Sequence, residues 1–226
     1  MSSAISTFTL SLLAPVPHAP APHCFFAVRP LIDGRDVVEE FFPDGLGAGP
    51  RKWFRTDGPL AATADPHEVR LAEDLCGAGC CGELSVTIRR EGDHVLWADW
   101  QNTGDNGRSL PDVRFDAAQY DAELHRAAHD RSWERPADAV ARLLDDTLRR
   151  EADWFARWEC DVDGVYPASD DPGWVDVYFH HSPRPWLRFG MRLPVTATEP
   201  AQVQADRLAA QVMTGDPRQA AGVRGV

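Results

Sequence analysis

The stretch Leu84-Ser85-Val86-Thr87-Ile88-Arg89 decides the fold class, because apolar side chains alternate strictly with polar ones along it. Alternation with a period of two is typical of a β-strand that buries one face. The turn Glu91-Gly92-Asp93 then reverses the chain, and residues 95–100 supply a returning strand. The sequence therefore predicts an antiparallel hairpin with one face in a core.

A second hairpin of the same kind is predicted near the C-terminus. Its apolar positions alternate on both strands, around a turn at residues 182–185: Val175, Val177 and Phe179, then Leu187, Phe189, Met191 and Leu193. Shorter strands are expected at residues 8–12, 24–32 and 69–71. The turn Asp33-Gly34 indicates that residues 37–42 return as a further strand.

Three helices are expected between and after these hairpins. Asp116 is a suitable N-cap for a helix that continues to about residue 131. Pro136 fits the first turn of a second helix, whose apolar stripe continues to Trp158. Thr198 is expected to cap a last helix that ends near Gly215.

Hairpins with helices grouped between them favour an α+β fold, with a mostly antiparallel sheet from two or three hairpins packed against two to three helices. We expect one core, in which the helix over residues 136–158 covers both hairpins. The predicted division is a flexible N-terminal segment (1–23), a single α+β domain (24–215) and a frayed tail (216–226). The expected core residues are Leu84, Val86, Ile88, Val175, Val177, Phe179, Leu187, Phe189 and Leu193.

Composition limits the classes of function. The 226 residues include 35 acidic and 23 basic ones, a formal net charge of −12. Binding to nucleic acid or to an anionic membrane needs clustered Lys and Arg, so this charge argues against both partners. A basic protein partner, or solubility alone, is compatible with it. Lys52 is the only lysine, and no phosphate-loop motif precedes it, which effectively excludes Schiff-base and phosphate-loop chemistry.

The expected location is the cytoplasm. No run of the sequence approaches the ~18 apolar residues of a membrane span. The first basic residue is Arg29, too late for the basic start of a secretory signal. Five cysteines, an odd number in a chain without an export signal, favour reduced thiols.

Two stretches carry a resemblance to a known group of proteins: His67-Glu68-Val69-Arg70-Leu71-Ala72-Glu73 and Val95-Leu96-Trp97-Ala98-Asp99-Trp100. Together with the segment between them that contains Cys76, Cys80 and Cys81 (residues 76–82, here called the Cys-rich segment), they resemble a pattern in a family of uncharacterised proteins from high-GC Gram-positive bacteria. No activity is associated with that family. The resemblance therefore implies an origin and no mechanism.

The Cys-rich segment is the sharpest chemical feature. Cys76 and Cys80 have the spacing of a zinc knuckle, and the glycines around them would let the chain fold around an ion. However, adjacent cysteines such as Cys80 and Cys81 point apart, and no second pair with C-x2-C or H-x3-H spacing exists outside a predicted helix. Redox or disulfide chemistry is an alternative, and a Gly-rich turn with buried thiols is the preferred interpretation. No cofactor is expected.

Histidines offer a second set of candidate ligands. His180 and His181 end a strand, where consecutive side chains face opposite sides and cannot enter one site. Asp121, His125 and His129 lie one turn apart on a single helix face, a spacing that can hold a metal ion. An exposed polar face would also contain such residues.

Aromatic residues occupy the second face of the late hairpin: Trp174, Tyr178 and Trp186, with Arg188. If this face is open, it forms a binding surface rich in the residues that dominate protein interfaces. If a helix covers it, the same residues form a second layer of core. The pattern of alternation alone leaves both alternatives open.

Two functions remain. The first is a non-catalytic, immunity- or antitoxin-like protein that binds a basic protein partner. The second is an enzyme, or a ligand- or metal-binding protein, that uses Cys76, Cys80 and Cys81 or the histidines. Because no common catalytic motif is present, the sequence leaves open whether the protein is an enzyme. It also leaves the oligomeric state open.

Overall fold

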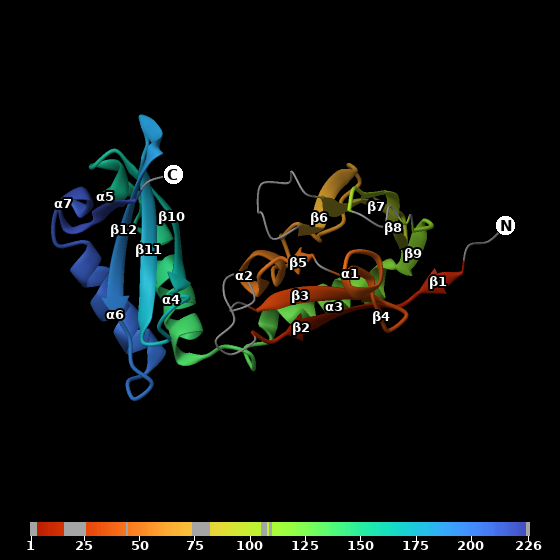
Figure 1. Cartoon of the computed structure of the whole chain (residues 1–226), viewed down its shortest axis with the longest axis horizontal. Coiled ribbons are helices and arrows are strands. Elements are labelled where there is room, and N and C mark those ends of the chain that lie inside the picture. Colours follow the sequence, from red (N-terminus) through yellow and green to blue (C-terminus); the bar gives the residue numbers. More distant parts are fainter. Residues whose placement is uncertain are drawn as a thin grey trace. The chain divides into compact units, whose positions relative to one another are not determined.

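The structure is a computed structural model that describes residues 4–15, 26–43, 45–73, 82–104, 108 and 110–224. The chain divides into two compact units, Met1–Asp130 and Arg131–Val226, here called the N-terminal unit and the C-terminal unit (Figure 1). Antiparallel sheets and helices make up both, which confirms the α+β class. The expected single domain over residues 24–215 is corrected, because the two predicted hairpins fall in different units and each unit encloses its own apolar side chains.

The N-terminal unit contains two sheets, of order β1-β9-β8-β7-β6-β5 and β2-β3-β4. Their pairings are antiparallel except for the parallel pair β1–β9. The bounds are β1 Ile5–Ser6, β2 Phe8–Leu13, β3 Ala27–Ile32, β4 Arg35–Asp36, β5 Leu46–Gly47, β6 His67–Glu73, β7 Glu83–Glu91, β8 His94–Asn102 and β9 Val113–Asp116. Strands β7 and β8 form the first predicted hairpin, and Leu84, Val86 and Ile88 are fully buried.

The segment expected to be flexible begins with two strands. β1 pairs with β9, and β2 pairs with β3 along its whole length. Phe8 is fully buried, so burial of its ring fixes the start of β2 in the core. The prediction of a flexible segment over residues 1–23 is therefore wrong for the residues of β1 and β2.

The chain after β3 also differs from expectation. Asp33 and Gly34 form the predicted turn with φ values of 52° and 78°, the left-handed conformation that this tight turn requires. Strand β4 is only two residues long, and the expected return strand over residues 37–42 is instead helix α1, Val37–Phe41. The Asp36 carboxylate causes this, because it accepts hydrogen bonds from the backbone N–H groups of Val38 and Glu39 (2.9 and 3.0 Å). A second short helix, α2, spans Pro50–Trp53.

An aromatic cluster fills the N-terminal unit. Phe8 stacks on Tyr120 with ring centroids 4.4 Å apart, and Trp97 and Phe115 complete the cluster. The Tyr120 hydroxyl donates to the carbonyl of Leu60 (2.8 Å) and accepts from Trp97 Nε1 (3.2 Å). Every polar atom of the cluster therefore has a partner inside the core.

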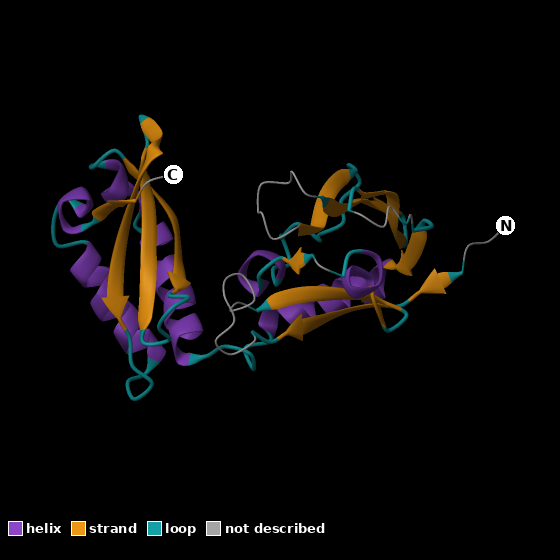
Figure 2. Ribbon diagram, in the orientation of Figure 1, coloured by secondary structure: helices purple, strands orange, loops and turns teal. Residues whose placement is uncertain are grey.

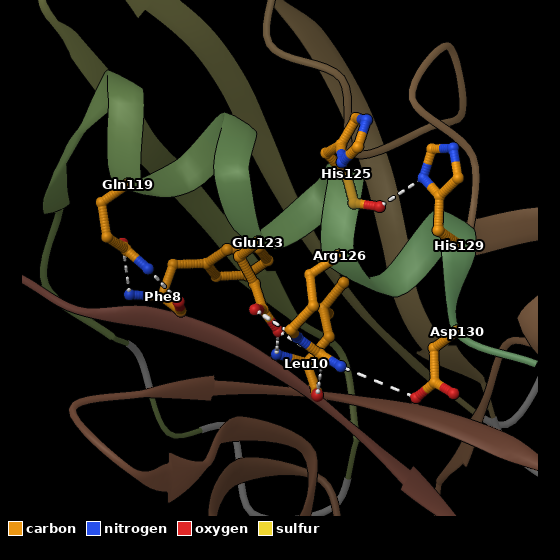
Figure 3. Close-up of polar contacts among 8 residues, drawn as sticks. All are labelled: Phe8, Leu10, Gln119, Glu123, His125, Arg126, His129 and Asp130. Carbon is orange, nitrogen blue, oxygen red and sulfur yellow. Dashed lines mark hydrogen bonds and ion pairs between the residues drawn. The ribbon is translucent and has the colours of Figure 1, made fainter. Parts of the chain in front are cut away.

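Helix α3, Ala117–His129, begins at the predicted N-cap Asp116 and lies beside β2 (Figure 3). Gln119 bonds both backbone groups of Phe8, accepting from its N–H (3.1 Å) and donating to its C=O (2.6 Å). Glu123 accepts from Leu10 N–H (2.6 Å), and Arg126 donates to Leu10 C=O (3.1 Å). Side chains of a helix thus hydrogen-bond the edge of β2 that no strand of the described residues pairs with.

The C-terminal unit has a four-stranded antiparallel sheet of order β10-β11-β12-β13, with α4 and α6 packed on one face (Figure 2). Its elements are α4 Pro136–Arg150, α5 Ala152–Ala156, β10 Cys160–Pro167, β11 Trp174–His181, β12 Arg184–Pro194, α6 Ala201–Val212, α7 Pro217–Ala220 and β13 Gly222–Arg224. The helix predicted over residues 136–158 breaks at Glu151, whose backbone leaves the helical conformation. Thr198 does not cap α6, because the N-cap position is Pro200 and the Thr198 hydroxyl bonds Thr196 Oγ1 (3.0 Å).

The core of this unit matches the predicted strand faces. Val175, Val177, Phe179, Phe189 and Leu193 are buried against the stripe of α4, with Leu187 packed at the margin. The expected frayed tail is corrected in part, because β13 pairs with β12 and α7 is capped by the Asp216 side chain.

Candidate functional site

The second face of the C-terminal sheet gathers the aromatic residues that the sequence singled out. In the strand register, Tyr178 lies opposite Gly190 on β12 and Gly164 on β10, and His180 lies opposite Arg188. Directly opposed residues share a face of a sheet, and this face is the reverse of the one that α4 and α6 cover. We call the residues Tyr166, Trp174, Tyr178, Trp186 and Arg188 the aromatic face.

The aromatic face is accessible to solvent. Trp186 is 67% exposed and Tyr166 is 45% exposed, while Trp174 and Tyr178 are half-buried. The alternative that these rings form a second core layer is therefore wrong for the described chain. All four binding residues predicted from sequence lie on this one face, and Tyr166 is an addition to them.

Arg188 is held in place by two contacts. Its guanidinium carbon lies 4.9 Å from the centre of the Tyr178 ring, a cation–π distance. Its Nε donates to Asp163 (2.7 Å), and the same carboxylate accepts from His180 Nδ1 (2.5 Å). Tyr178, Arg188, Asp163 and His180 thus form one connected group across three strands.

A second arginine is fixed farther along the same face. Arg192 donates two hydrogen bonds to Asp176 (2.8 and 3.0 Å) and one to Asp170 (2.9 Å). These bonds raise the pKa of the Arg192 guanidinium above its usual range, chiefly through Asp176, and lower the pKa of Asp170. Arg188 and Arg192 are thus each paired with a carboxylate of the same sheet, Asp163 and Asp176.

The histidine of this group does not form a catalytic triad. His180 donates to Asp163 as a triad histidine would donate to its aspartate. The nearby hydroxyl of Ser182, however, donates to Asp161 (2.5 Å) rather than to the imidazole. Because the base and the nucleophile are not bonded to each other, these residues lack the arrangement that activates a serine.

The predicted cysteine site, Cys76, Cys80 and Cys81, lies outside the described residues. Cys160 is buried and forms no disulfide, and burial raises the pKa of its thiol, which disfavours the reactive thiolate. Within the described ranges, no group of three or more His, Cys, Asp or Glu side chains could hold a metal ion. Asp121, the third member of the predicted helix row, is bonded to Arg90 (2.6 Å), and the row is not among the groups of described residues that could hold a metal ion.

Sequence reasoning missed Tyr166 and Asp163, because it missed strand β10. The signal was present: Val162 and Val165 are apolar beside Asp161 and Tyr166. A register shift between Val162 and Gly164 interrupts the alternation, so a strict period of two does not detect the strand.

Comparisons with known proteins found no match to this chain. No protein-family model matches this chain, and no curated protein or solved structure is significantly similar to it. None of the helices in the described part of the chain combines the length and apolar character needed to cross a bilayer.

Proposed function

We propose that this protein is a non-catalytic binding protein that recognises a basic protein partner through its aromatic face. The exposure of Trp186 carries the proposal, because two thirds of this large side chain is open to solvent. Trp, Tyr and Arg are the residues that contribute most to binding free energy at protein interfaces. Here they come together on the sheet face opposite to the one that α4 and α6 cover.

Charge supports a basic partner. The N-terminal unit has 20 acidic and 11 basic residues, a formal charge of −9, and the C-terminal unit has 15 and 12, a charge of −3. The carboxylates of Glu159, Asp161 and Asp170 belong to the C-terminal unit and are each more than 60% exposed. Because opposite charges attract over about a Debye length, these groups favour encounter with a positively charged surface.

The contacts that Arg188 makes within the sheet indicate how a basic side chain of such a partner would be bound. Its guanidinium lies against a tyrosine ring and is bonded to a carboxylate of the same face. Exposed rings at Trp186 and Tyr166, on a unit whose Asp161 and Asp170 carboxylates are mostly exposed, offer the same chemistry to an arginine or lysine of another protein. The proposed contact is therefore cation–π stacking combined with an ion pair.

The experiment is affinity capture from the native lysate with three forms of the protein: wild type, Trp186→Ala and Val203→Ala. Val203 is the matched control, because it is an exposed apolar residue (51%) of the same unit on α6. Wild type and Val203→Ala should capture the same basic protein, and Trp186→Ala should lose it. Raising the salt concentration should weaken capture. Equal capture by all three forms, or capture of an acidic protein, would contradict the proposal.

The competing function is an enzyme or ligand-binding protein that uses the Cys-rich segment or the histidines. Among the described residues, Ser182 donates to Asp161 and not to His180, which weighs against an enzyme that uses this histidine to activate a serine. Purified protein without stoichiometric zinc, and with Cys76, Cys80 and Cys81 reduced, is what the binding proposal expects. About one equivalent of zinc that is lost in Cys76→Ser would favour the competing function.

A further inference from the structure

The outer side of α3 carries two histidines that the binding proposal does not use. His125 and His129 are both exposed, and their rings stack with centroids 4.1 Å apart and planes inclined by 29°. Figure 3 shows both rings on the side of α3 away from β2, while Glu123 and Arg126 point toward that strand. The pair is thus open to solvent and separate from the polar contacts that hold the helix.

One hydrogen bond fixes which nitrogen of His129 can bind a ligand. Nδ1 of His129 lies 2.8 Å from the backbone carbonyl oxygen of His125. A carbonyl only accepts, so Nδ1 carries the hydrogen and Nε2 of the neutral ring keeps its lone pair. Metal-binding histidines are commonly oriented in this way, with one nitrogen donating to a carbonyl and the other on the metal.

Helix geometry brings the two rings close enough to share one ion. Residues four apart are neighbours on a helix surface, with Cβ atoms about 5–6 Å apart. Two imidazole nitrogens at about 2.0–2.1 Å from one metal ion are roughly 3 Å apart, so stacked rings need only tilt toward each other. Nickel, copper and zinc are among the divalent ions that imidazole ligands suit.

We propose that His125 and His129 form a two-histidine site for a late first-row divalent transition-metal ion. Water fills the remaining coordination positions, since Asp121 is bonded to Arg90 and supplies no third ligand. The site therefore exchanges its ion with solvent and differs from a closed structural zinc site. The charge of −9 on the N-terminal unit favours accumulation of cations near it.

The ion would connect the last two turns of α3. Arg126, between the two histidines in sequence, bonds Glu123 and the carbonyl of Leu10. A ligand that binds the folded helix and not the unfolded chain stabilises the folded state. Metal binding is therefore expected to stabilise the end of the N-terminal unit where α3 holds β2.

The test is calorimetric titration of the metal-free full-length protein with Ni²⁺ alone. His125→Gln and His129→Gln should each weaken one equivalent of Ni²⁺ binding at least tenfold. His67→Gln is the matched control, since the imidazole of His67 bonds the Pro59 carbonyl (2.9 Å) and lies outside the pair. Sites elsewhere on the chain, such as the cysteines, contribute equally to all these forms and cancel in the comparison.

Thermal unfolding provides a second readout. Without metal, the two glutamine variants should unfold within about 2 °C of wild type, because both histidines are exposed. Excess Ni²⁺ should raise the unfolding temperature of wild type and His67→Gln by more than it raises that of either variant. The proposal is overturned if wild type binds no Ni²⁺ through this pair, seen as unchanged affinity and stoichiometry in both variants. It is also overturned if only one of the two substitutions weakens binding.

Discussion

The two units use aromatic residues in opposite ways. In the N-terminal unit, Phe8, Trp97, Phe115 and Tyr120 are fully buried and contact one another. In the C-terminal unit, the rings of the aromatic face stay accessible, and Trp186 is the most exposed of the large apolar side chains described. The same residue types thus serve packing where both sides of a ring are covered, and offer a binding surface where one side of a sheet is left open.

The largest effect is expected in the buried cluster. Trp97→Ala removes a fully buried indole and leaves the Tyr120 hydroxyl without one partner. Such a change is expected to lower the free energy of unfolding of the N-terminal unit by about 3–5 kcal/mol. Denaturant titration followed by circular dichroism measures it, and Trp97→Phe serves as a milder form if the alanine variant does not fold. A loss below about 1 kcal/mol would contradict full burial.

A smaller effect is expected where α3 holds β2. Glu123→Ala removes the acceptor for Leu10 N–H and the partner of Arg126, at a carboxylate only 9% exposed. Leaving a buried donor unsatisfied costs about 1–3 kcal/mol. The matched control is Glu199→Ala, which removes the more exposed ion pair with Arg207 and should cost less than about 0.5 kcal/mol. Equal losses in these two variants would mean that the side chains of α3 do not stabilise β2.

Burial of Tyr120 makes the free energy of unfolding of the N-terminal unit depend on pH. Burial raises the pKa of its phenol far above the ordinary value near 10, so the folded state keeps the proton when the unfolded chain loses it. The free energy of unfolding should therefore be unaffected by this group below pH 10 and fall above it, by about 1.4 kcal/mol per pH unit. Tyr120→Phe should lack this slope in denaturant titrations at pH 9 to 11. Identical slopes in both forms would show that Tyr120 ionises in the folded protein.

The smallest effect on stability is expected at the open face. Trp186→Ala removes a mostly exposed ring, so the free energy of unfolding should change by less than about 0.5 kcal/mol. Denaturant titration again provides the measurement. A loss above 2 kcal/mol would show that the Trp186 ring is packed in the folded protein.

Local patterns in the sequence predicted much of the fold. The alternation around Val86, the strand faces around Val177 and the N-cap Asp116 each depend on neighbouring residues, and the structure has all three as predicted. The aromatic face was also visible, because a strand with one apolar face must direct its other side chains away from the core. Whether this second face stays open was not predictable, since it depends on where α4 and α6 pack.

The errors arose where distant residues decide the outcome. The number of units depends on which strands pair, and nothing local distinguishes a hairpin that joins the first sheet from one that joins another. Helix α1 formed where the turn Asp33-Gly34 indicated a return strand, because the Asp36 side chain caps it. Residues 5–13 are held against the core by Phe8. Its ring contacts Trp97 and Tyr120, which are about 90 and 110 residues away along the chain.

The affinity for the captured basic partner, measured for Trp186→Ala beside Val203→Ala, tests the proposed function most directly. Trp186→Ala should weaken binding by about 2 kcal/mol, or roughly 30-fold, while both variants unfold as wild type does. The salt dependence of the association rate should persist in both, because neither substitution changes charge. If Trp186→Ala binds the partner as tightly as Val203→Ala, the aromatic face is not the binding surface.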